Sequence, residues 1–186
     1  ERKEALLDLC RFSTNENDDP ISLSGYVEKM PEKQKDIYYI SAETTDQALA
    51  SPHLEGFKSK KIPVLIMTDA IDQFWLPMVG SFKEKKFTSI TQGQINLDDL
   101  DEKNKDKKKD DKNEKEKKDK EYVDLVAQLK VVLGDQVKDI RLSSKLTDSP
   151  VCLVADEGDM DIAMEQLMAQ RDTNYKGAPR ILEING

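Results

Sequence analysis

Residues that could carry out catalysis are few in this chain and far apart. Cys10 and Cys152 are the only cysteines, and His53 is the only histidine. Zinc sites are usually built from several Cys and His ligands, so we expect no metal site. Two distant thiols also predict no disulfide framework. His53 lies in Ser-Pro-His-Leu, a pattern typical of a helix start, and we interpret it as a structural or surface histidine.

Motifs that bind nucleotides or activate a nucleophile are also missing from the sequence. It contains no GxGxxG, GxxxxGK[ST], HExxH or CxxC pattern, and its eight glycines are scattered. Carboxylates are abundant, but on a polar chain they more often form a solvated surface than an acid/base pair. The sequence therefore predicts no catalytic residue, no cofactor-binding residue and no enzymatic activity for this chain.

Apolar side chains in the stretch 158–172 are better candidates for function. Met160, Met164 and Met168 lie four residues apart, with Leu167 between the last two. A helix would place all four on one side. Because methionine is flexible and polarizable, it is common on surfaces that bind varied partners. The alternative is that this side packs on a sheet formed by the last three strands.

A second candidate contact is the pair Phe74 and Trp75, which includes the only tryptophan. Neighbouring residues on a helix point about 100° apart, so both rings cannot lie deep in one narrow core stripe. We expect at least one ring near the surface. The alternative is that Trp75 serves only domain packing.

Composition restricts the classes of partner. The net charge is −8 over 186 residues, and 35% of the residues are charged. This acidic balance argues against nucleic acid, and no apolar run approaches the roughly 20 residues that cross a membrane. We therefore expect a cytoplasmic chain that binds neither nucleic acid nor membrane. The start at Glu1, without an initiator methionine, suggests a processed chain or an excised fragment.

The elements expected in the first half alternate between helix and strand. Helices are expected over 1–12, 22–30, 44–50, 51–60 and 70–80, and strands over 37–40, 63–67 and 87–90. Ser22, Thr44 and Asp69 are the expected helix caps. This order predicts a small parallel sheet with helices on its faces, and hence an α/β class (α+β overall) with a three-layer αβα domain.

The stretch 98–121 separates this half from the second. It contains ten Lys and eleven Asp or Glu, and this mixture cancels the field that phosphates would require. We expect a charged linker or a helix that is frayed in its middle. Beyond it we expect a helix ended by Gly134, strands at 137–142, 151–154 and 180–184, and the methionine helix. The expected division is a helical segment 1–35, an αβα part 36–97, the charged stretch 98–121 and an incomplete α+β domain 122–186.

Several separate stretches resemble the heat shock protein ninety family, in a form similar to the bacterial high-temperature protein G type. They include Leu-Cys-Arg-Phe-Ser at 9–13, Ser-Pro-His-Leu-Glu at 51–55, Asp-Ala-Ile-Asp at 69–72, Val-Lys-Asp-Ile-Arg-Leu at 137–142 and Leu-Glu-Ile-Asn at 182–185. The resemblance covers nearly the whole chain outside the charged stretch. It implies the rear of the middle domain and the front of the carboxy-terminal domain of an ATP-driven, dimeric chaperone.

The resemblance also implies partners. The family's nucleotide pocket and catalytic arginine precede this region and its dimerising helices follow it, so ATP, magnesium and homodimerisation are implied for a full-length parent only. The client-binding residues that the resemblance implies are Phe74, Trp75, Met160, Met164, Leu167 and Met168. Partly unfolded client proteins are the expected partners, with co-chaperones as further candidates.

Two alternatives stay open. In one, both apolar sets are interior and the chain is a structural spacer between working domains. In the other, the chain is a small α/β enzyme that acts on a nucleotide or phosphate at the strand ends near Ala42 or Asp69. Solvent exposure of the methionines separates client binding from the spacer.

Overall fold

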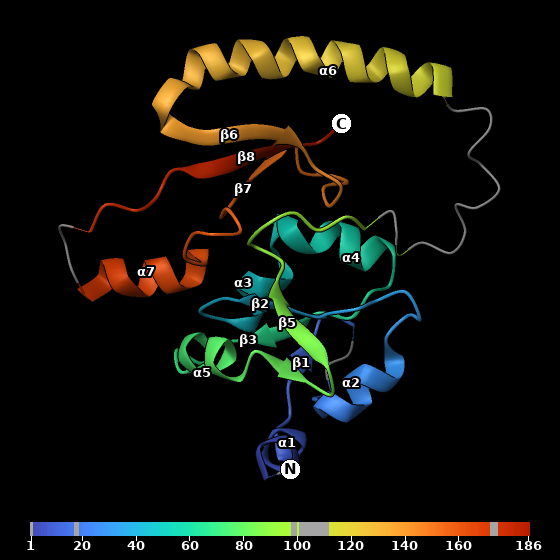
Figure 1. The fold of residues 1–186 in the computed structure, drawn as a ribbon, viewed down its shortest axis with the longest axis vertical. Coiled ribbons are helices and arrows are strands. Elements are labelled where there is room, and N and C mark those ends of the chain that lie inside the picture. Colours follow the sequence, from blue (N-terminus) through green and yellow to red (C-terminus); the bar gives the residue numbers. More distant parts are fainter. Residues whose placement is uncertain (1, 17–18, 98–99, 101–111, 172–174) are drawn as a thin grey trace.

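Two sheets organise the chain in the computed structural model, which describes residues 2–16, 19–97, 100, 112–171 and 175–186 (Figure 1). The first half forms a five-stranded sheet with the order β1-β3-β2-β5-β4, and the second half forms a three-stranded sheet with the order β6-β8-β7. Helices accompany both sheets (Figure 1). The α/β class expected from the sequence is confirmed.

The centre of the first sheet is parallel, as expected. Strand β2 (Ile37–Ser41) pairs in parallel with β3 (Leu65–Met67) on one side and with β5 (Lys85–Ser89) on the other. Two short strands, β1 (Ser13–Thr14) and β4 (Ser81–Phe82), add antiparallel edges that the sequence analysis missed. The segment 1–35, expected to be helical, thus also contributes a strand to the sheet.

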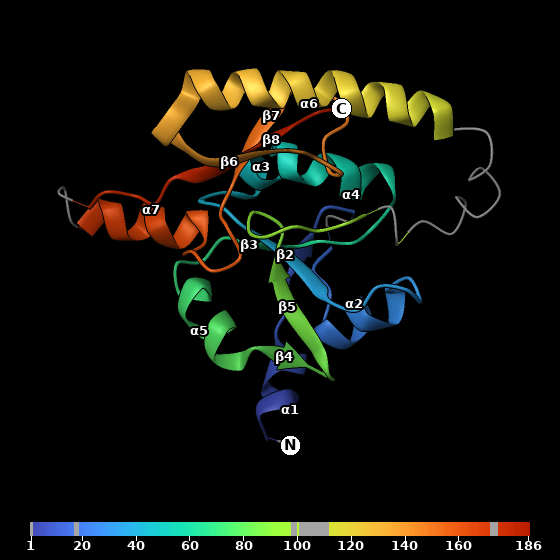
Figure 2. The same cartoon turned by 45° about the horizontal axis from the view of Figure 1, so that its top comes forward.

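Helices cover both faces of this sheet (Figures 1 and 2). One face carries α3 (Thr45–Leu49), the 3₁₀ helix η1 (Pro52–Leu54) and α4 (Glu55–Ser59), and the other carries α2 (Leu23–Lys29) and α5 (Asp72–Val79), with α1 (Arg2–Leu9) nearby. The buried segment around β3 supplies both cores, because alternate side chains point to opposite faces. Val64 and Ile66 lie in one core, and Leu65 and Met67 in the other.

Two of the three expected helix caps are confirmed. The side chains of Ser22 and Thr44 accept hydrogen bonds from backbone N–H groups in the first turns of α2 and α3. The expectation that Asp69 caps a helix from residue 70 is wrong. Helix α5 begins at Asp72, whose carboxylate accepts a hydrogen bond from the Asp69 N–H at 3.3 Å, so the aspartate inside the helix stabilises the turn before it.

The second sheet follows the long helix α6 (Lys112–Leu133) and the short 3₁₀ helix η4 (Gly134–Gln136). Strands β6 (Val137–Leu142), β7 (Val151–Val154) and β8 (Arg180–Ile184) have the bounds expected from the sequence, and α7 (Ile162–Arg171) lies between the last two. In Figures 1 and 2, α6 runs alongside β6. The stretch 98–121 was expected to be a charged linker or a helix frayed in its middle. Of its first part, 98–111, only Leu100 belongs to the described residues, so this expectation lies outside them. No described helix is both long and apolar enough to span a bilayer.

Candidate apolar binding surface

The start of α7 is fixed to the first sheet by Asp161. This residue accepts a hydrogen bond from the Ala163 N–H at 2.9 Å and so caps the helix. Its other carboxylate oxygen accepts from the hydroxyls of Ser89 at 2.5 Å and Thr91 at 2.8 Å, at the end of β5. Met160 therefore precedes the helix, and the expectation that all three methionines share one helix is wrong for it.

The orientation of α7 differs from that of an ordinary amphipathic helix. Its one buried residue is Glu165, which pairs with Arg180 and accepts a hydrogen bond from the Ala178 N–H at 2.6 Å. By contrast, Met160 and Met168 are 41% and 37% exposed. The acid thus docks the helix, and apolar side chains are left in contact with water.

Met164 and Leu167 are both half-buried. Leu167 lines the cleft described below, whereas Met164 does not. The four residues predicted around α7 thus differ in exposure: Met160 and Met168 are exposed, and Met164 and Leu167 are half-buried.

The aromatic pair on α5 divides between surface and interior. Phe74 is 41% exposed. Trp75 is half-buried, with its ring centroid 6.1 Å from that of Phe12 and 5.8 Å from that of Phe87, and its indole N–H donates to Asp72 at 2.7 Å. Phe74 is therefore the ring presented to solvent, and Trp75 mainly packs within the domain.

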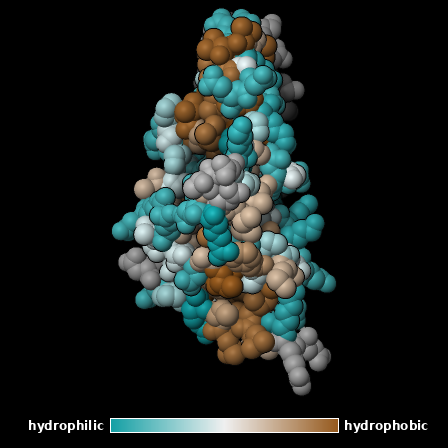
Figure 3. Space-filling model, turned by 90° about the vertical axis from the view of Figure 1, so that its left-hand side faces the viewer, coloured by the Kyte–Doolittle hydropathy of each residue, from teal (hydrophilic) through white to brown (hydrophobic). Residues whose placement is uncertain are grey.

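Two exposed apolar residues beside Phe74 were missed by the sequence analysis. Ile71 and Met78 are 63% and 83% exposed. The spacing 71, 74, 78 places the three residues along one side of the helix, a signal that was present in the sequence. Figure 3 shows that apolar surface on this side of the molecule forms several patches divided by hydrophilic residues, rather than one continuous face.

A cleft of about 160 Å³ lies between α5 and α7. Its floor is at the carboxyl ends of β2 and β3. After these two strands the chain continues on opposite faces of the sheet. Open α/β sheets commonly bind ligands at such a position. Its lining residues are Ser41, Ala42, Glu43, Met67, Thr68, Asp69, Ala70, Gln73, Ala163, Gln166, Leu167 and Gln170. They include two carboxylates but no Lys, Arg or Gly, so the cleft does not fit a phosphate group.

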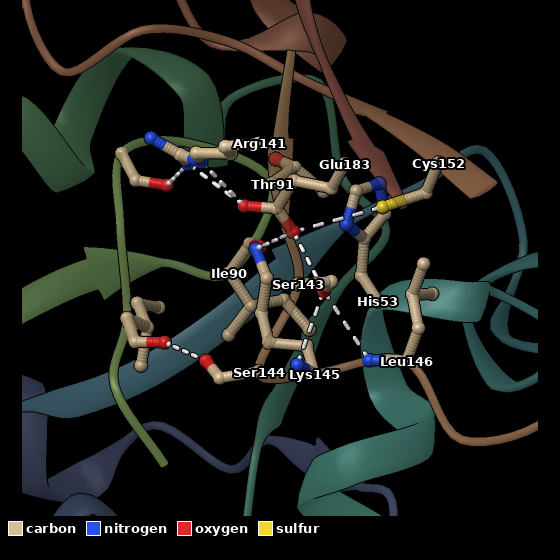
Figure 4. A network of polar contacts seen from close by, with 12 residues as sticks. His53, Ile90, Thr91, Arg141, Ser143, Ser144, Lys145, Leu146, Cys152 and Glu183 are labelled. Carbon is tan, nitrogen blue, oxygen red and sulfur yellow. Dashed lines mark hydrogen bonds and ion pairs between the residues drawn. The ribbon is translucent and has the colours of Figure 1, made fainter. Parts of the chain in front are cut away.

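A buried ionic network holds the second sheet against the first (Figure 4). Lys145 is 1% exposed; its ammonium donates to the Ile90 carbonyl at 3.1 Å and lies 3.4 Å from the Glu183 carboxylate. Arg141 bridges Glu183 and the Gly93 carbonyl, both at 2.7 Å. Burial opposes ionisation of Glu183, but Lys145 and the hydrogen bonds from Arg141 and Ser143 outweigh it and hold the pKa of this carboxyl below its ordinary value.

A second contact between the two halves is made by Glu55 and Gly56 at the start of α4. The Glu55 carboxylate accepts hydrogen bonds from the backbone N–H groups of residues 147–149 and from the Ser149 hydroxyl. Burial tends to raise the pKa of Glu55, but these donors outweigh it and lower the pKa to about 2. The Gly56 N–H donates to the Lys145 carbonyl at 2.6 Å, an approach that leaves no room for a side chain.

The histidine and the buried thiol lie in this junction rather than in a catalytic arrangement (Figure 4). Burial, and then the charge of Lys145, lower the pKa of His53 to about 4, so its imidazole is neutral at pH 7. Burial, and then the charge of Glu183, raise the pKa of the Cys152 thiol to about 12, so it is not a nucleophile at neutral pH. Among the described residues, no group of three or more His, Cys, Asp or Glu is placed to hold a metal ion.

Comparison with known proteins shows which protein family the whole chain resembles. The family model described as Hsp90 protein matches residues 1–186. Chaperone protein HtpG of Roseobacter denitrificans is 43% identical over 183 residues, which cover 98% of this chain and 29% of the relative. The HtpG proteins of Wolbachia pipientis and Streptomyces coelicolor are 38% and 39% identical, over all of this chain and 29% and 28% of the relatives. The chain therefore spans less than a third of the length of these relatives. Because the family model matches it from the first residue to the last, the chain belongs to the Hsp90 family.

Proposed function

We propose that this chain binds partly unfolded polypeptides through the exposed apolar side chains of α5 and α7, as the client-contacting part of a chaperone. The observation that carries the proposal is the orientation of α7. Its buried residue is Glu165, whereas Met168 on the helix and Met160 just before it are exposed. A helix that only served packing would bury its methionines and expose its acid.

The proposed mechanism is weak contact at several points. Covering the exposed part of one methionine gains about 1 kcal/mol, so several contacts together hold a segment while allowing its release. The flexible methionines fit different sequences, and Phe74, at 41% exposure, supplies a larger anchor. Because Asp161 and Glu165 already fix α7, binding does not require the helix to become ordered first.

The longer protein supplies the rest of the proposed activity. The relatives are named chaperones. In this proposal, ATP and magnesium act in parts of such a protein outside this chain, where hydrolysis changes the arrangement of the binding surfaces. Homodimerisation, co-chaperone contacts and a cytoplasmic location likewise belong to the proposal for the longer protein. The cleft at Ala42 and Asp69 offers no cationic residue for a phosphate, so no observation favours a nucleotide-dependent enzyme in this chain.

The test is capture of a permanently unfolded protein, such as fluorescently labelled, carboxymethylated α-lactalbumin. We expect the variant Met160→Ser/Met168→Ser, with Phe74→Ser added, to bind several-fold more weakly than the unchanged chain. The control is Leu6→Ser/Leu9→Ser, which removes two apolar side chains of 66% and 73% exposure on α1, a helix that lies away from α7 (Figure 1). Equal loss in both variants, or no loss in either, would contradict the proposal.

A further inference from the structure

We propose that the cleft between α5 and α7 receives a lysine or arginine side chain of the bound polypeptide. The chain would then prefer segments in which a basic residue is flanked by apolar ones. This inference rests on the proposed function, and it adds a specificity that apolar contact alone does not provide.

The walls of the cleft suit the alkyl part of a long cationic side chain. The face of α7 that lines it consists of residues 163, 166, 167 and 170, which follow helical spacing. Ala163 and Leu167 from this face, together with Ala42 and Ala70 opposite, provide apolar contacts. Lysine and arginine commonly lay their methylene groups along such surface while the charge stays at a polar edge.

The charges that line the cleft favour a cation. Glu43 and Asp69 both line it and both are exposed, and neither takes part in an ion pair within the described part of the chain. Within the described residues, one side-chain hydrogen bond spans the cleft: the Gln170 amide donates to Glu43 at 3.5 Å. At this distance the contact is weak, and an incoming ammonium or guanidinium group can replace it. The side-chain oxygens of Gln73 and Gln166 are further acceptors.

The size of the cleft argues for one side chain. Pockets for small-molecule ligands usually have volumes of about 300–1,000 Å³, whereas this cleft has about 160 Å³. Exposed apolar residues come directly after lining residues on both helices, although they do not line the cleft themselves: Phe74 follows Gln73, and Met168 follows Leu167. A bound segment can therefore place a basic side chain in the cleft and apolar side chains on either side.

The experiment compares three labelled peptides that share a leucine- and phenylalanine-rich sequence and differ at one central residue: lysine, norleucine or glutamate. Norleucine keeps the alkyl stem and removes the charge. By fluorescence anisotropy, we expect the unchanged chain to bind the lysine peptide about three- to fivefold more tightly than the norleucine peptide, and the glutamate peptide most weakly. Glu43→Gln/Asp69→Asn should abolish this preference while keeping affinity for the norleucine peptide.

Two further variants complete the test. Glu28→Gln/Glu32→Gln makes the same charge change at exposed positions on and beyond α2, away from the cleft, and should keep the preference. Glu43→Gln/Asp69→Lys, which leaves one positive charge at the cleft, should reverse it in favour of the glutamate peptide. If all peptides bind equally and only the methionine variant weakens them, the cleft inference fails and the proposed function stands. If no peptide binds, both fail.

Discussion

The junction between the two sheets and the surface around α7 place side chains in opposite ways. The junction buries charge: Lys145 and Glu183 are 1% and 2% exposed. The surface exposes apolar groups, with Met160 and Met168 at 41% and 37%. Lysine and glutamate are almost never fully buried unless they are paired, and methionine is usually buried. The junction therefore buries residue types that are usually exposed, and the surface exposes a residue type that is usually buried.

Buried ions fix an orientation in a way that apolar contacts do not. An apolar interface tolerates sliding because the hydrophobic effect is non-directional, whereas a buried carboxylate needs its donors at defined positions. The apolar cluster of the second half is small, consisting of Leu146, Cys152 and Val154. The polar junction therefore fixes the two sheets relative to each other, while Asp161 and Glu165 hold α7 itself. The side chains of Met160 and Met168 take no part in this junction, and their exposure is what the proposed client binding requires.

Loss of one buried charge should produce the largest effect. Glu183→Gln keeps the shape of the side chain but leaves Lys145 and Arg141 without their buried counter-charge. We expect the free energy of unfolding, measured by urea titration, to fall by about 3–5 kcal/mol. Glu157→Gln, at an exposed position, is the control and should stay within about 0.5 kcal/mol. A Glu183→Gln variant as stable as this control would show that the junction does not depend on its charge.

Acid should weaken the same junction through His53. The pKa of His53 is about 4 in the folded chain against an ordinary value of 6.5, so the unfolded state binds more protons between these values. This contribution to stability is complete above pH 6.5 and is lost as the pH falls towards 4, up to about 3 kcal/mol in total. His53→Gln should remove this part of the pH dependence of unfolding. Glu55, with its pKa lowered from 4.5 to about 2, acts in a separate, more acidic range. An unchanged slope between pH 4 and 6.5 would contradict the assignment.

Backbone contact at the junction should be the next most sensitive feature. In Gly56→Ala, the new Cβ would lie 2.6 Å from the Lys145 carbonyl oxygen and 2.8 Å from Leu97 Cδ1. The carbonyl belongs to the backbone and cannot move aside, so we expect a loss of about 1–3 kcal/mol in thermal or urea unfolding. Gly158→Ala is the matched control, since no atom lies within 4 Å of its Cβ position. Similar stabilities of the two variants would show that the halves approach each other less closely.

Elements that depend on residues close together in the sequence were predicted correctly. The strands β6, β7 and β8 were predicted at their observed bounds because each is an apolar run between turn residues. Ser22 and Thr44 were predicted as caps because capping depends on residues two or three positions away. The two-residue strands β1 and β4 were missed because they are too short to show alternation.

Features that depend on contacts between distant residues could not be predicted. The spacing of Met160, Met164 and Met168 favoured one helix, but the bonds from Ser89 and Thr91 to Asp161 set its start. Glu165 has the polarity of a solvated residue, and only its pairing with Arg180 makes it the buried one. The ionic junction also links residues about 40 to 90 positions apart, and no local pattern reports such pairs.

The smallest expected effect on stability is also the sharpest test of the comparison. Met160→Ser/Met168→Ser changes side chains that are already partly in water, so the free energy of unfolding should change by less than about 1 kcal/mol. Met67, which is 2% exposed in the core of the first sheet, is the reference: Met67→Ala should cost about 2–5 kcal/mol. Urea titration of the two variants thus compares methionines at the surface with a methionine in the core. If Met160→Ser/Met168→Ser were as destabilising as Met67→Ala, these methionines would serve packing. The proposal that they bind unfolded polypeptides would then be wrong. If the double variant stays stable while capture of unfolded protein falls, stability and binding are carried by separate side chains.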